Sequence, residues 1–252
     1  MKWLLLFLFS SSSAFAQLDY SAETLFRHHP LAVFLKGQVG YGVKIWDKSG
    51  PQKEFLYGYT RAALMAQTSG TLQSYNLEFH LAPISIFDLY VGTGSVIRMS
   101  NSLPTFDCDQ VVCKDSNLSR QYIGVRNAMA FGPYYLMNDW RMTYQDPSKN
   151  DRVFADELSS LLGSAGRDIL TQDTALIGYK FDPEYSVGVL NQYNVMKNFA
   201  NSTNMAVLFA RREWKEWSAL LGPGMHHDRN NHTHPTFLFN LKWTGNKGVT
   251  LF

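Results

Sequence analysis

The chain has 252 residues, of which 45% are hydrophobic, 14% aromatic and 17% charged, and its formal net charge is only +2. This length can supply a sizeable folded domain, and the small net charge does not indicate nucleic acid or another acidic polymer as a partner. No stretch after residue 16 approaches the roughly 20 apolar residues that a membrane-spanning helix needs. An integral membrane protein of this sequence could therefore only be a closed β-barrel, because an open sheet leaves backbone groups unpaired in lipid.

Residues 1–16 have the layout of a cleaved secretory signal. Lys2 precedes an apolar run from Trp3 to Phe9, and the small-x-small triplet Ala14-Phe15-Ala16, which is typical of a cleavage site, ends the segment before Gln17. The run is too short to span a bilayer, and its serine cluster argues against a buried N-terminal helix. We therefore predict export, with residues 17–252 forming one domain.

Period-two alternation of apolar and polar residues follows, and it is typical of a strand with two unlike faces. In SYNLEFHL (74–81) the apolar side chains take the odd positions and the polar ones the even positions. The same alternation recurs in four further segments: 86–94, 138–144, 175–181 and 236–243.

The alternation and the turn residues between the runs predict an all-β chain of about twelve strands. The expected strands are 17–26, 33–46, 54–67, 71–82, 86–99, 119–131, 134–145, 172–181, 185–196, 203–212, 214–223, and 235–244 with an extension to 252. Ten strands remain the alternative if 17–26 is not a strand and one of the others is wrongly split, since single-chain bacterial barrels have an even number. We favour twelve.

The connections alternate between short and long. Short ones with proline or aromatic residues occur at 81–87, 131–136, 181–186 and 211–217, whereas long polar ones occur at 100–118, 146–172, 197–204 and 224–235. Short turns on one rim and long loops on the other are the pattern of bacterial outer-membrane barrels.

In these features, together with the export signal and the aromatic residues near strand ends, the chain resembles Gram-negative outer-membrane β-barrel proteins. The resemblance covers the mature chain and is one of architecture, not of a functional family. It implies a closed antiparallel transmembrane barrel in outer-membrane lipid, with short periplasmic turns, long extracellular loops and the outer-membrane assembly machinery as a partner. The terminal Phe252 is similar to the aromatic residue that this machinery reads. Because Phe252 is out of phase with Phe237–Trp243, residues 244–248 must hold a bulge or turn.

A soluble periplasmic β-sandwich or barrel is the rival fold, because its strands alternate as well but turn their apolar face inward. If the polar face lines a lumen, that lumen holds acidic and basic side chains in nearly equal number. The candidates are Glu78, His80, Asp88, Arg98, Arg126, Asp139, Arg141, Lys180 and Lys242. A barrel of ten to twelve strands has little room beyond its own side chains, so we favour a lumen filled by ion pairs over a narrow polar channel for small solutes.

Two clusters invite a chemical interpretation. Cys108 and Cys113 are expected to form a disulfide after export, because a zinc site needs more ligands than two nearby cysteines. The segment MHHDRNNHTH offers possible ligands for a transition metal: His226, His227, Asp228, His232 and His234. The ordinary explanation, a polar surface loop, is favoured. The pair His28–His29 before Pro30 could add ligands only if its turn lies on the same rim.

Catalytic signals are weak. Ser164 lies in GSAG, which is not the Gly-x-Ser-x-Gly elbow of hydrolases, and the His226 and Asp228 pair lies in a loop. We therefore predict no catalytic residues and no resident cofactor other than the candidate metal. The expected function is a narrow solute channel or a structural barrel that presents surface loops. Alternatives are a loop-binding, adhesion or assembly-partner protein and, less favoured, an outer-membrane hydrolase of lipid or peptide or a metal-binding barrel.

Overall fold

The computed structural model describes residues 16–47, 56–100, 103, 106–113, 117–149 and 152–250. The apolar run of the predicted signal and the terminal Phe252 lie outside these residues. The first described residue, Ala16, already belongs to a strand and pairs with Val43.

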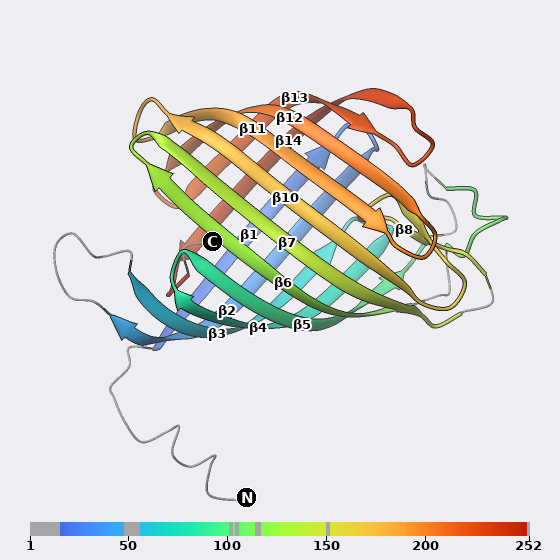
Figure 1. Ribbon diagram of the computed structural model, residues 1–252, viewed down its shortest axis with the longest axis horizontal. Coiled ribbons are helices and arrows are strands. Elements are labelled where there is room, and N and C mark those ends of the chain that lie inside the picture. Colours follow the sequence, from blue (N-terminus) through green and yellow to red (C-terminus); the bar gives the residue numbers. More distant parts are fainter. Residues whose placement is uncertain are drawn as a thin grey trace, which may run out of the picture.

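Twelve antiparallel strands close into one barrel (Figure 1), so the predicted fold class and strand number are confirmed. Its strands are β1 (Ala16–Arg27), β2 (Ala32–Asp47), β3 (Tyr57–Thr68), β4 (Leu72–Ile84), β5 (Phe87–Arg98), β6 (Leu118–Phe131), β7 (Tyr134–Pro147), β10 (Asp168–Lys180), β11 (Tyr185–Met196), β12 (Asn201–Trp214), β13 (Trp217–His227) and β14 (Thr233–Asn246). β1 pairs with β14 from Ser21 opposite Thr244 to Arg27 opposite Leu238, which closes the sheet. A separate hairpin consists of β8 (Phe154–Asp156) and β9 (Leu161–Gly163). The described residues contain no helix that is long and apolar enough to cross a membrane.

The two ends of the barrel differ in their connections (Figure 1). At the end where β1 begins and β14 ends, hereafter the turn end, four connections are only two to four residues long: 85–86, 132–133, 181–184 and 215–216, while β2 and β3 are joined there through residues 48–56. At the other end, the loop end, β5 and β6 are joined through residues 99–117, and β7 and β10 through residues 148–167. The predicted asymmetry of the rims is therefore present only in part, because two loop-end connections are long, whereas 28–31, 69–71, 197–200 and 228–232 are nearly as short as most connections of the turn end.

Two predicted loops are shorter than expected. The connection after β11 comprises only residues 197–200, and the histidine loop only 228–232. The polar residues on either side of these loops were expected to be loop residues, but they continue the paired strands. In the histidine segment, for example, His226 pairs with His234 and His227 with Thr233. Strands of a barrel can extend beyond the bilayer, where backbone pairing persists and side chains no longer need to be apolar.

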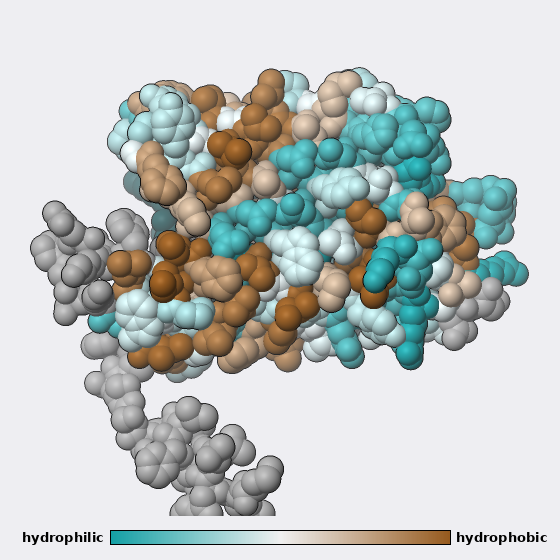
Figure 2. Space-filling model, viewed as in Figure 1, coloured by the Kyte–Doolittle hydropathy of each residue, from teal (hydrophilic) through white to brown (hydrophobic). Residues whose placement is uncertain are grey.

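The outward face carries the apolar side chains, as a membrane barrel requires and a soluble sandwich does not. Leu77, Ile177 and Leu208 are 49%, 58% and 64% exposed within their strands. Aromatic side chains are exposed near the turn end, among them Phe131, Tyr134, Phe181 and Trp217. In Figure 2 brown surface covers much of the barrel wall toward the turn end, and teal surface gathers at the loop end. The rival sandwich fold is thus wrong, and the chain has the architecture of an outer-membrane β-barrel.

A few polar side chains interrupt this outer wall between β7 and β12, where they bond to one another. Asn138 donates to Asp173 at 2.6 Å, and Asn191 donates to Asn204 at 2.9 Å. Such pairs satisfy groups that lipid cannot.

The predicted irregularity in residues 244–248 is also present. The register of β1 and β14 shifts between Tyr20 opposite Asn246 and Ser21 opposite Thr244, so Gly245 is the extra residue of a bulge. The chain then turns at Gly248, whose φ of 58° suits glycine. This turn places Val249, which is fully buried, beside the inward-facing Tyr57 and Tyr59.

Candidate functional site

A network of charged side chains lines the inner wall of the barrel from β4 to β7. His80 lies between two carboxylates, with one ring nitrogen 2.9 Å from Asp88 and the other 3.0 Å from Glu78. Glu78 also accepts a hydrogen bond of 3.0 Å from the Tyr122 hydroxyl. All four side chains are at least nine-tenths buried, so the polar face predicted for β4 and β5 is the inner face.

A second part of the network lies on β6 and β7. Arg126 pairs with Asp139 at 2.9 Å, and its guanidinium lies 4.4 Å from the centre of the Tyr90 ring. The Tyr90 hydroxyl donates to the same Asp139 at 2.6 Å. Arg141 donates to the side-chain oxygen of Gln172 at 2.6 Å and 3.2 Å. Adjacent opposite charges and hydroxyls thus satisfy one another inside the barrel.

Two further predicted lumen residues lie elsewhere on the wall. Lys242 is opposite Glu23 across the closing seam between β1 and β14. Lys180 is the last residue of β10 at the turn end, where it is exposed and its ammonium pairs with Glu213 at 3.2 Å. Lys180 therefore belongs to the rim and not to the interior, because the strand ends at this residue.

Two polar cavities remain along the lumen. The larger, of about 220 Å³, is lined by side chains of both signs, among them Lys36, Glu78, Arg126 and Asp139. The smaller, of about 60 Å³, lies toward the loop end, where Asp156 and Leu158 form part of its lining. Arg141 lines both cavities.

The β8–β9 hairpin, here called the cap, covers the lumen at the loop end. Its Phe154 and Leu161 are fully buried against inward-facing side chains of the strands that surround them: Leu72, Val96, Leu118, Leu170 and Met196. Gly163 is required for this packing, because a Cβ atom there would lie 2.1 Å from the Phe154 ring. The cap therefore inserts an apolar plug into an otherwise polar interior.

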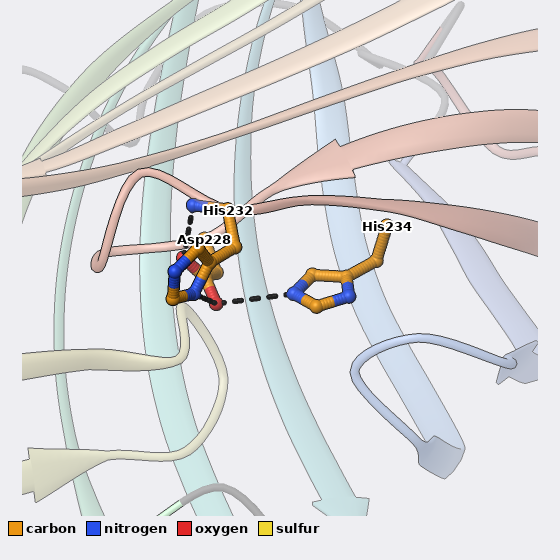
Figure 3. A group of neighbouring side chains, drawn as sticks. All are labelled: Asp228, His232 and His234. Carbon is orange, nitrogen blue, oxygen red and sulfur yellow. Dashed lines mark hydrogen bonds and ion pairs between the residues drawn. The ribbon is translucent and has the colours of Figure 1, made fainter.

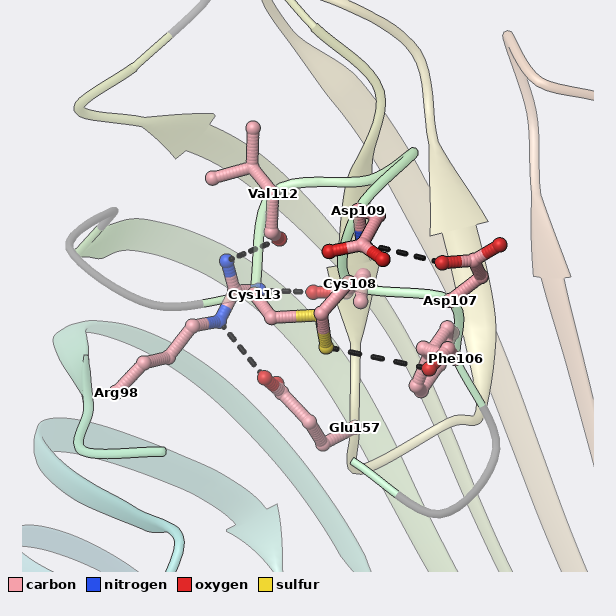
Figure 4. Close-up of a disulfide and its surroundings, with 9 residues drawn as sticks. Arg98, Phe106, Asp107, Cys108, Asp109, Val112, Cys113 and Glu157 are labelled. Atoms are coloured by element: carbon pink, nitrogen blue, oxygen red, sulfur yellow. Dashed lines mark hydrogen bonds and ion pairs between the residues drawn. A yellow bond between two sulfur atoms is a disulfide. The ribbon is translucent and has the colours of Figure 1, made fainter. Parts of the chain in front are cut away.

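Charged groups hold the cap against the lumen wall. The buried Asp156 accepts from Arg120 and from the Ser159 hydroxyl. Glu157 pairs with Arg98 at 2.9 Å (Figure 4). Arg98 also donates to the Ala155 carbonyl. Burial raises the pKa of Glu157, while Arg98 opposes this shift. Arg98, predicted as a lumen residue, thus contacts the cap.

The predicted disulfide between Cys108 and Cys113 is formed (Figure 4). Its short loop packs on the cap, where Val112 accepts from and donates to the backbone of residues 153–155. Cys113 and Ala155 are buried in one apolar cluster with Leu103. The cross-linked loop and the cap therefore form one structured outer surface.

The histidine segment forms a tight five-residue loop at the same end (Figure 3). The Asp228 carboxylate gathers two of the predicted metal ligands, with the His234 Nε2 atom at 3.3 Å and the His232 Nδ1 atom at 3.8 Å from Oδ2. The other oxygen, Oδ1, accepts backbone N–H groups of Asn230 and His232. These backbone bonds hold the pKa of Asp228 below its ordinary value, although burial opposes them.

The β1–β2 turn meets this loop, as its place on the same rim allows. The His29 ring centre lies 4.1 Å from that of His234 and 5.8 Å from that of His226. Two hydrogen bonds between the His29 backbone and Thr236 hold the turn against β14. Partial burial and the neighbouring His234 lower the pKa of His29. The β1–β2 turn and the histidine loop thus lie on the same rim, which is the condition under which the sequence predicts further ligands from His28 and His29. Of these two, the structure places the His29 ring beside the cluster.

The other predicted ligands face elsewhere. His227 bonds to Thr233 at 3.0 Å on the exposed side of the loop. His226 faces inward and is 3% exposed, and its Nδ1 atom has no hydrogen-bond partner among the described residues. The Ser164 hydroxyl, the nucleophile considered from the sequence, donates to the Arg167 carbonyl at 3.0 Å.

Sequence reasoning missed the buried ion pair that joins β1 to β3. Arg61 donates to both oxygens of Asp19 at 2.6 Å and 2.8 Å, and it lies 3.3 Å from His80. It also missed the cap, because three-residue strands within a polar loop carry no periodic signal.

No protein-family model and no curated protein sequence matches the chain. Among solved structures, the chain is similar to OmpT of Vibrio cholerae at a TM-score of 0.46 and 9% identity, over 93% of this chain and 99% of that one. It is also similar to the translocator domain of the autotransporter NalP from Neisseria meningitidis (TM-score 0.39, 10% identity, 95% and 91% coverage). A third similar structure is an anion-selective porin from Comamonas acidovorans (TM-score 0.39, 6% identity, 92% and 100% coverage). Likenesses at this level carry no information on activity.

Proposed function

We propose that this chain is a closed outer-membrane barrel whose role is to anchor and present a structured outer surface, and that it is not a constitutively open channel. The observation that carries the proposal is the docking of the cap, whose buried Asp156 and Glu157 pair with Arg120 and Arg98 on the barrel wall. Displacing the plug would break these charge pairs and expose the apolar side chains of Phe154 and Leu161 to water.

In this proposal residues 1–16 direct export, residues 17–252 fold in the outer membrane with the loop end outside the cell, and the assembly machinery is the partner for insertion. The outward apolar belt supports a lipid environment. The presented surface consists of the cap, the Cys108–Cys113 loop and the histidine loop, all at the loop end.

Conductance in planar lipid bilayers tests the closed state. We expect the purified, refolded wild-type chain to give no discrete channel steps, because the cap covers one end of the lumen and Val249 packs inside the other. Regular discrete steps from the wild-type protein would contradict the proposal.

A gated channel is the second candidate function, favoured by the polar cavity of about 220 Å³ behind the cap. A variant in which Asn-Gly replaces residues 154–163 tests it, since the two ends of the hairpin are paired neighbours that a two-residue turn can join. Steps that appear in this variant and change with Arg141→Ala identify the cap as a plug. Silence of a cap-less variant that also carries Val249→Ala, which reduces the packing at the other end, eliminates the gated channel and leaves the structural role.

A further inference from the structure

The histidine loop places three metal-binding side chains around one point at the outer rim. One donor atom from each of Asp228, His232 and His234 can be chosen so that all three lie within 4.8 Å of one another. Tetrahedral zinc with bonds of about 2.0–2.2 Å separates its donor atoms by roughly 3.3–3.6 Å. The distance of 3.3 Å between Asp228 and His234 falls in this range, and the 3.8 Å between Asp228 and His232 exceeds it by a few tenths of an ångström. The widest separation among the three donor atoms, at most 4.8 Å, must close by about 1 Å, which a rotation of the exposed His232 side chain can supply.

The carboxylate at the centre is oriented before any ion arrives. Oδ1 of Asp228 is held by the N–H groups of Asn230 and His232 at 2.8 Å and 2.9 Å, which leaves Oδ2 directed at the two imidazoles (Figure 3). The loop itself is closed by a backbone bond of 2.9 Å from Asp228 to the His232 carbonyl. Ligands held by such outer bonds lose less freedom when they bind a metal.

Two further imidazoles flank the three donors. His29 stacks on His234 from the β1–β2 turn, and the buried His226 is the cross-strand neighbour of His234 on the inner face. The Nδ1 atom of His226 is buried and has no hydrogen-bond partner among the described residues. Because buried polar atoms normally have a partner, this nitrogen is an independent sign that a ligand binds at this end of the lumen wall.

We propose that Asp228, His232 and His234 bind a divalent transition metal ion at the outer rim, with His29 as the adjacent imidazole that packs against the site. Neutral imidazole with one carboxylate suits zinc, nickel and copper(II), whereas magnesium and calcium prefer oxygen donors. The bound ion links the β13–β14 loop to β14 beside the seam where the barrel closes.

Isothermal titration calorimetry with zinc chloride tests the proposal on the full mature chain, refolded in detergent without a polyhistidine tag. The wild-type protein is expected to bind one equivalent. His232→Ala, His234→Ala and Asp228→Asn should each weaken binding by about 10-fold or more, and magnesium should give no heat. Asp228→Asn retains an oxygen that can accept the two backbone N–H groups, so the loop keeps its shape.

The matched controls are His28→Ala and His227→Ala, two histidines on the same rim that are not among the three donors: His28 is exposed, and His227 bonds to Thr233 and Asn231. Both should bind zinc as the wild type does, and all variants should retain the heat-modifiable gel mobility of the folded barrel. A flat wild-type titration overturns the proposal. Equal losses in the control and ligand variants also overturn it, because they indicate unspecific binding to exposed histidines.

Discussion

Each buried charge in the lumen network depends on the residues around it. Glu78 illustrates this: it is 2% exposed and is contacted by His80, Tyr122 and, at 3.8 Å, Arg126. Such a group stabilises the fold only while its partners are present, since an unpaired buried charge costs more than the pair contributes. The stability of each inward charge therefore depends on partners that lie partly on neighbouring strands.

Glu78→Ala should consequently destabilise the folded barrel by about 3–5 kcal/mol, the typical cost of removing one partner of a buried pair. Urea unfolding in lipid vesicles, followed by tryptophan fluorescence, measures this change. Glu184→Ala is the matched control: Glu184 is a half-exposed carboxylate in a turn, 3.5 Å from Arg212, and its removal should cost no more than about 1 kcal/mol. Similar losses for the two variants would show that the lumen pairs are solvated.

At the scale of elements, the cap and the Cys108–Cys113 loop behave as one unit. The loop contributes a bridge from Val112 to Phe154, and the cap contributes the apolar side chains that fill the mouth. Neither segment has the length or periodicity of an independent strand. Their order comes from docking onto the barrel.

Replacing both cysteines with serine should loosen this unit without affecting the barrel. Closing a loop of this size restricts the unfolded segment by about 2 kcal/mol in the chain-entropy treatment. We expect trypsin to cleave the 99–117 and 148–167 connections faster in the variant, while the strands stay protected. Wild-type protein treated with dithiothreitol should behave like the variant, and unchanged cleavage in both would show that packing alone orders the loop.

For the whole molecule, the decisive property is the separation of an apolar outer wall from a charged interior. Leu77 and Gln73 lie on the same outward face of β4, with Leu77 near mid-strand and Gln73 near the loop end. The cost of a charge on such a wall depends on its depth in the bilayer.

Leu77→Arg should therefore destabilise the barrel in lipid vesicles by about 2–4 kcal/mol, and Gln73→Arg by only about 0–1 kcal/mol. Urea titration of both variants in the same vesicles compares the two depths. Equal costs at the two positions would mean that this wall does not face a bilayer in the proposed orientation.

Much of the architecture is readable in the sequence, because a two-residue period determines which side chains share a face. The alternation in residues 74–81, the short turns and the position of the bulge near 244–248 correspond to the strands, the turn end and the β1–β14 seam. Export by residues 1–16 stays a prediction, since most of that segment lies outside the described residues.

Which face points inward, and what occupies the mouth, was decided only by the tertiary structure. Alternation is symmetric between inside and outside, so only closure of twelve strands places Glu78 inside and Leu77 outside. The cap lacks periodicity, and its position depends on residues far away in the chain, such as Arg120 for Asp156. His29 and His234 are likewise separated by most of the chain and meet because the first and last strands pair, a contact that no local pattern encodes.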